Sequence, residues 1–286
     1  MTGDCHGRAP ILIGDETQRE INQLMNTQHA GEWADLSAEA VRIVSEAGEA
    51  GVTLRVIGSA GIRLHCNAPG EVMDLLGRPA KDIDFVVPEK HRKGMRRYLE
   101  SRGYVTDRDL LIAMEGTRYS FRHADSGTDL DVFVERLDFC HTIEIRSRLH
   151  QHPITLPVEE LMLAKLQIIE MTMTDVMDVG VILATHRVGD GENPEAIDGK
   201  HIARLLATDW GFHHTATRNL RRIAELVGDS AAIDIGAREN AQVRAGVEQL
   251  LAVIEAEPKS TRWRMRAKIG ERKQWWQDVD EKEATY

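Results

Sequence analysis

Two aspartates separated by one residue, Asp82 and Asp84, lie in a short and otherwise mostly apolar run that ends at Pro88. In a β-strand successive side chains point to opposite faces, so both carboxylates would share one face while Ile83 and Phe85 face a core. Neighbouring carboxylates repel each other unless a cation neutralises them, and oxygen ligands favour Mg²⁺ or Mn²⁺. The pattern therefore indicates either a divalent metal site at a strand end or an ordinary amphipathic strand with one face in solvent.

A glycine turn upstream has the composition of a phosphate site. The β-prone residues 53–57 are followed by Gly58-Ser59 and then by residues that favour a helix. Glycine lets the backbone approach a ligand closely, and the amides at a helix N-terminus attract phosphate. Most turns of this kind only connect two elements, so the meaning of this one depends on what lies beside it.

A third acid follows in a predicted β-hairpin. Residues 118–123 and 129–134 both alternate, and the five residues between them include a glycine, which is typical of a hairpin. Asp129 and Asp131 would lie on the same face of the second strand, so both are candidates for the third acid. We prefer Asp131, because it lies deeper in the strand, between Leu130 and Val132.

The order of these features resembles the nucleotidyltransferase superfamily that includes DNA polymerase β. That family has a Gly-Ser or Gly-Gly turn between a strand and a helix, an Asp-x-Asp strand, and one more acid on a neighbouring strand. The resemblance implies that Asp82, Asp84 and Asp131 are catalytic residues that bind Mg²⁺ (or Mn²⁺). Gly58 and Ser59 would cradle the phosphates of an NTP substrate. Two metal ions about 3.5–4 Å apart would clamp the attacking and leaving oxygens.

A later segment extends the resemblance to minimal, abortive-infection-type nucleotidyltransferases (AbiEii- and MenT-like). Within residues 156–166 a lysine, Lys165, follows a leucine-rich turn. In that family such a lysine neutralises phosphate charge and is followed by aspartates, which Asp175 and Asp178 could match. The resemblance covers about residues 50–180. It departs from the family pattern between Ser59 and Asp82, where residues 66–80 would be an insertion.

The fold class indicated is α/β (α+β). Strands and helices alternate up to about residue 150, and the resemblance implies a nucleotidyltransferase core with a small mixed sheet. We expect two domains: residues 1–150, the core with N-terminal helices, and residues 151–286, an α-helical domain. The active site would lie in the cleft between them. A strand at 11–13, a helix at 16–30, and later helices near 175–187, 194–208, 211–228, 237–256 and 259–279 are predicted.

Composition limits the environment in which the chain works. With 286 residues, 42% of them hydrophobic, and a net charge of −10, it can bury a core. Its three cysteines are scattered without a C-x-x-C pair, which favours a reducing cytoplasm over a disulfide framework. No signal peptide and no apolar run of the ~20 residues that cross a bilayer can be found. We therefore expect a soluble, cytoplasmic protein with no membrane partner.

A basic segment near the C-terminus contrasts with the acidic whole. Residues 258–276 hold seven lysines and arginines together with Trp263, Trp275 and Trp276. Such a segment can bind nucleic acid through phosphate contacts and base stacking. Alternatively, the tryptophans pack on the domain while the charged groups stay solvated.

The resemblance also implies a reaction, the transfer of NMP from an NTP such as ATP to an acceptor hydroxyl with release of pyrophosphate. Our first expectation is a toxin-like transferase that modifies tRNA or protein, with a cognate antitoxin as a partner. An aminoglycoside-type antibiotic adenylyltransferase is the alternative enzyme. A nucleotide-binding protein that keeps the fold without turnover is the alternative from another class, although the intact set of acids favours an enzyme.

Overall fold

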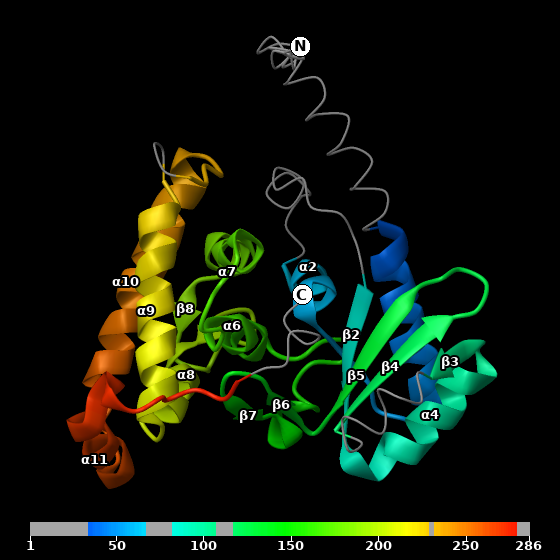
Figure 1. Ribbon diagram of the computed structural model, residues 1–286. Coiled ribbons are helices and arrows are strands. Elements are labelled where there is room, and N and C mark those ends of the chain that lie inside the picture. The colour runs from blue at the N-terminus through cyan, green and yellow to red at the C-terminus, as the bar shows by residue number, and fades with distance from the viewer. Residues whose placement is uncertain (1–33, 67–81, 107–116, 229–231, 279–286) are drawn as a thin grey trace, which may run out of the picture.

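The computed structural model describes residues 34–66, 82–106, 117–228 and 232–278 (Figure 1). The fold is mixed α/β, with one small mixed sheet and many helices. The predicted strand at 11–13, the predicted helix at 16–30 and all but the first residue of the proposed insertion at 66–80 lie outside the described residues.

The main sheet has five strands, in the order β1 (Arg55–Ile57), β2 (Asp82–Val87), β5 (Asp129–Val134), β4 (Arg118–His123) and β3 (Tyr104–Thr106). The central strand, β5, runs parallel to its neighbour β2, whereas every other neighbouring pair is antiparallel. The predicted hairpin is confirmed, because β4 and β5 pair directly. The sheet therefore brings the Asp-x-Asp strand and the hairpin acid side by side.

One face of the sheet is apolar and covered by helices. Ile83 and Phe85 of β2 and Leu130 and Val132 of β5 are at most 1% exposed. They share a core with the helical residues 34–49 and with α4 (Arg92–Ser101). The alternation of apolar and polar residues in the sequence thus assigns the buried face correctly. It also places the aspartates on the other face.

The second face of the sheet changes from polar to apolar along its strands. Asp82 and Asp84 come first, and the next residue on that face of β2, Val86, is fully buried. Val86 joins Phe133 of β5 in the larger of the two apolar cores, which also contains the helical residues downstream. The acids therefore lie where this face passes from polar to apolar.

The chain after residue 156 is mainly helical, as predicted. Its helices are α6 (Val158–Leu166), α7 (Met173–Thr185), α8 (Gly199–Leu206), α9 (Trp210–Leu226), α10 (Ala237–Ala256) and α11 (Thr261–Ile269). The predicted domain boundary near residue 150 falls in the irregular segment before α6. One apolar core holds residues from both sides of that boundary, among them Ile57 and Leu161. None of the helices in the described ranges has the length and apolar character needed to cross a membrane.

Three details differ from the predicted helices. The helix predicted over 194–208 begins only at Gly199, because Asp198 accepts a hydrogen bond from the amide of His201 as its N-cap. Residues before it form a two-residue ladder of β8 (Val188–Gly189) and β9 (Ile197–Asp198). The helix predicted over 259–279 ends at Ile269, because Gly270 (φ +61°) leaves the helical conformation. A short 3₁₀ turn, η3 (Gly270–Arg272), follows it.

A second small hairpin, of β6 (Arg136–Asp138) and β7 (Thr142–Glu144), was not predicted. It follows β5 directly along the chain. Leu137 and Ile143 pair across the two strands and are fully buried in the larger core. The hairpin therefore connects the sheet to the helical part of the molecule.

Candidate active site

The three predicted acids come together at the centre of the sheet. The register of the parallel strands pairs Asp84 with Asp131. Because paired residues share a face and Asp82 lies two positions before Asp84, all three side chains project from the same side. One carboxylate oxygen from each lies within 4.8 Å of the other two. Such a set of hard oxygen donors suits Mg²⁺ or Mn²⁺.

Asp129, the other candidate for the third acid, lies outside this group. Its two carboxylate oxygens accept hydrogen bonds from Nε and Nη2 of Arg122, at 2.7 and 2.6 Å. Both partners of this ion pair are well exposed. The geometry therefore places Asp131, the deeper acid, beside Asp82 and Asp84.

Two side chains of β4 fix the orientation of Asp131, and neither was predicted from the sequence. Arg118 donates from Nη2 to Oδ2 of Asp131 at 2.9 Å, and Ser120 donates to Oδ1. The guanidinium of Arg118 is almost fully buried and lies 5.2 Å from the ring centre of Phe133. The signal was present in the alternation of residues 118–123, which places Arg118 and Ser120 on the face of the acids.

Asp84 is the most buried of the three acids, with 8% of its surface exposed. Burial, followed by the charges of Asp82 and Asp131, raises the pKa of Asp84 to about 8, although Lys165 and Arg118 act in the opposite direction. Its Oδ1 is buried and accepts no hydrogen bond from any group in the described part of the chain. Such an oxygen is costly to bury. A divalent cation would give it a partner and hold the carboxyl group ionised, so the residues fit a metal.

The predicted glycine turn lies against this carboxylate. Ile57, the last residue of β1, is the register partner of Asp84, and α2 (Gly58–His65) follows it directly. Gly58 has φ +62°, and a Cβ there would lie 2.1 Å from Oδ2 of Asp84. Both the backbone conformation and the space therefore require glycine.

Lys165 and Ser59 belong to a second polar cluster, which joins α2, α6 and α7. The ammonium of Lys165 lies 2.9 Å from Oδ1 of Asp175 and 3.0 Å from Oδ2 of Asp178, and all three side chains are buried. Ser59 donates to Oδ2 of Asp178 at 2.9 Å. The two aspartates expected after the lysine thus lie beside it. The hydroxyl of Ser59, expected to face phosphate, is directed to α7 in this structure.

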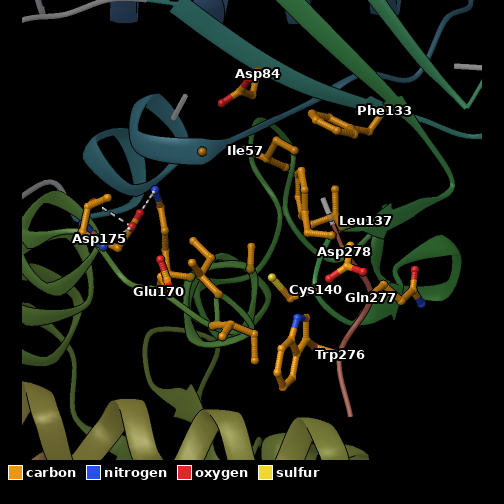
Figure 2. A pocket seen from close by; sticks show the side chains of 17 residues that line it. Ile57, Asp84, Phe133, Leu137, Cys140, Glu170, Asp175, Trp276, Gln277 and Asp278 are labelled. Atoms are coloured by element: carbon orange, nitrogen blue, oxygen red, sulfur yellow. Dashed lines mark hydrogen bonds and ion pairs between the residues drawn. The ribbon is translucent and has the colours of Figure 1, made fainter. Parts of the chain in front are cut away.

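A cavity of about 340 Å³ begins at these groups (Figure 2). Gly58, Asp84 and Lys165 line its polar end. Most of the remaining wall is apolar. It comes from β5, the β6–β7 hairpin, α6 and the residues just after α6, with Phe133, Leu137, Phe139, Ala164 and Ile168. A cavity of this size is within the range of small-molecule sites. It suits a ligand with a charged end and an apolar body.

The C-terminal segment also lines this cavity, which was not predicted. We call residues 273–278 the strap; its Trp276, Gln277 and Asp278 lie in the wall. Three of the basic residues before the strap, Lys259, Arg266 and Arg272, make structural contacts. Arg266 lies over the ring of Trp210 at 4.7 Å and, like Arg272, donates to backbone carbonyls. For these residues the contacts favour the packing interpretation over nucleic-acid binding.

Comparisons with models of protein families and with curated proteins found no match to this chain.

Proposed function

We propose that this protein is a Mg²⁺-dependent nucleotidyltransferase, which moves NMP from an NTP to an acceptor hydroxyl and releases pyrophosphate. One observation carries the proposal. Asp82, Asp84 and Asp131 gather on neighbouring strands, and the buried Oδ1 of Asp84 accepts no hydrogen bond from the described residues. A glycine turn packs against the same carboxylate. The order of these features resembles the superfamily that includes DNA polymerase β, and the mixed sheet around them is compatible with that fold.

The three acids would hold one or two divalent cations. Bound there, such ions neutralise triphosphate charge and polarise the α-phosphate and the attacking hydroxyl. Asp131, held in place by Arg118 and Ser120, is the group that we assign to receive the proton of the acceptor hydroxyl. The acceptor oxygen bonds to the α-phosphorus, the bond from that phosphorus to its bridging oxygen breaks, and pyrophosphate leaves with the electron pair.

The remaining predicted residues would bind the triphosphate. The first turn of α2 begins at Gly58, beside Asp84, and free amides at such a turn suit phosphate oxygens. Lys165 contributes a positive charge at the same end of the cavity. Asp175 and Asp178 hold its ammonium in place before the nucleotide arrives, and they also offset much of its charge.

The second part of the proposal is the identity of the acceptor. The segment around Lys165 resembles toxin-like transferases, so we propose tRNA or protein as the acceptor and a cognate antitoxin as a partner. An aminoglycoside-type adenylyltransferase would instead modify a small-molecule hydroxyl. A non-catalytic nucleotide-binding protein would bind NTP and transfer nothing.

These alternatives separate in one labelling experiment. The protein is incubated with each α-labelled NTP, Mg²⁺ and cell extract, and label is measured in the RNA, protein and small-molecule fractions. We expect transfer that EDTA abolishes and that Asp84→Asn lowers at least about a hundredfold, because a metal ligand is lost. Asp129→Asn is the matched control, since that acid lies outside the group of three, and it should transfer normally. Absence of label with every NTP, or equal transfer by Asp84→Asn, would contradict the proposal.

A further inference from the structure

The strap, residues 273–278, is held firmly across one side of the cavity. After α11 the chain returns toward the β6–β7 hairpin (Figure 1, red). The amide of Gln277 donates to the carbonyl of Cys140 at 2.9 Å, and its side-chain amide donates to Thr142 at 3.2 Å. Next to it, the indole N–H of Trp275 donates to Thr215 of α9 at 3.1 Å. The strap is thus attached both to the hairpin and to α9.

Trp276 is the aromatic side chain that the strap contributes to the cavity (Figure 2). Its ring centre lies 4.7 Å from that of Trp275, and the two ring planes are nearly perpendicular. Trp275 in turn packs against the rings of Trp210 and His214 on α9. The indole of Trp276 therefore makes an edge contact with a second indole that is itself attached to α9, and it borders the cavity near Cys140 (Figure 2).

The two ends of the cavity differ in the chemistry they can bind. Asp84, Gly58 and Lys165 lie at one end, where a metal and phosphates would be held. Trp276 and apolar side chains such as Phe139 form much of the other part of the wall, where the strap also contributes Gln277 and Asp278. An anion alone would leave the apolar part empty, and an apolar ligand alone would leave the polar end unused. A nucleoside triphosphate matches both, because its flat base is suited to stacking on an aromatic ring.

We propose that Trp276 is the wall on which the nucleobase stacks, and that the strap therefore helps to determine which NTP binds. The inference rests on the proposed function and adds a specificity-determining residue to it. Purines overlap an indole over a larger area than pyrimidines do, so ATP and GTP should bind more tightly than CTP and UTP.

The test compares nucleotides with a ligand that has no base. Dissociation constants are measured by calorimetry in Mg²⁺ for the four NTPs and for inorganic tripolyphosphate. Trp276→Ala should weaken ATP binding about tenfold, which is a moderate loss for base stacking, and should reduce the preference for purines. Tripolyphosphate binding should stay within about twofold, and Trp276→Phe should retain most of the ATP affinity. Met265→Ala, an exposed change on α11, is the matched control.

A second measurement needs no variant. Cys140 lines the cavity near Trp276 and is partly exposed, so alkylation of its thiol, followed by peptide mass spectrometry, reports occupancy of the apolar part. MgATP should slow this alkylation, whereas magnesium tripolyphosphate should not.

The outcomes separate the two proposals. If the wild-type protein binds neither tripolyphosphate nor any NTP in Mg²⁺, the proposed function fails. If NTPs bind, but Trp276→Ala binds them as tightly as wild type or MgATP leaves alkylation of Cys140 unchanged, only the inference about Trp276 is overturned.

Discussion

Gly58→Ala would test whether close packing of the turn on Asp84 holds the three acids of the proposed metal site in position. A Cβ at residue 58 would lie 2.1 Å from Oδ2 of Asp84 and 3.1 Å from its Cγ. The carboxylate must therefore leave its present position beside Asp82 and Asp131. In addition, φ +62° costs an L-residue about 1–2 kcal/mol. We expect the variant to lose at least that much stability and to bind Mg²⁺ or Mn²⁺ at least about tenfold more weakly, because the ligand set is broken.

Gly51→Ala is the matched control for the backbone cost. Gly51 also has a positive φ, +75°, but an added Cβ would meet nothing within 4 Å. The Gly51→Ala variant should lose about 1–2 kcal/mol of unfolding free energy because of the backbone conformation alone, and it should keep the metal affinity of the wild type. Urea unfolding in EDTA gives the stability of each variant, and calorimetric titration with Mn²⁺ gives the affinity. Metal binding by Gly58→Ala within twofold of the Gly51→Ala value would refute the reasoning.

Two further predictions concern the charges of the site. In EDTA, the free energy of unfolding should fall as pH rises from about 4 to about 8. In the unfolded chain Asp84 ionises near its ordinary pKa, whereas in the folded protein its pKa is about 8 and it keeps its proton over this range. Urea titrations across that range should show a smaller slope for Asp84→Asn, and an unchanged slope would contradict this assignment. Lys165→Met should cost about 3–5 kcal/mol, because the buried Asp175 and Asp178 lose the ammonium between them. Adding Asp178→Asn should recover part of that loss in thermal unfolding, and no recovery would argue against the pairing.

Much of the sheet could be predicted, because strand alternation and turn residues are recognised from short stretches of sequence. The alternation around Ile83 and Phe85 assigned the buried face, and the same alternation placed Asp82 and Asp84 together on the other. The hairpin of β4 and β5 followed from its glycine turn. These inferences need only the two-residue period of a strand. They predict which side chains share a face, although the order of strands in the sheet is set by contacts between distant residues.

The part of the cavity wall that the strap forms could not be predicted, because it depends on contacts between residues far apart in the chain. Gln277 and Thr142, which attach the strap to the hairpin, are 135 residues apart. Periodicity says nothing about such pairs. The helix predicted to run through the strap is a different kind of error. Gly270 is the residue type that commonly ends a helix, and that signal was available in the sequence.

The parallel pairing of β2 with β5 has a consequence for how this protein can change during evolution. Buried core residues and the three acids of the proposed metal site alternate along the same strands. Substitutions in the core can therefore alter stability while the acids stay unchanged. Loss of a single residue from either strand would exchange the two sets, because the remaining residues would move to opposite faces. These strands should therefore accept many substitutions and very few insertions or deletions.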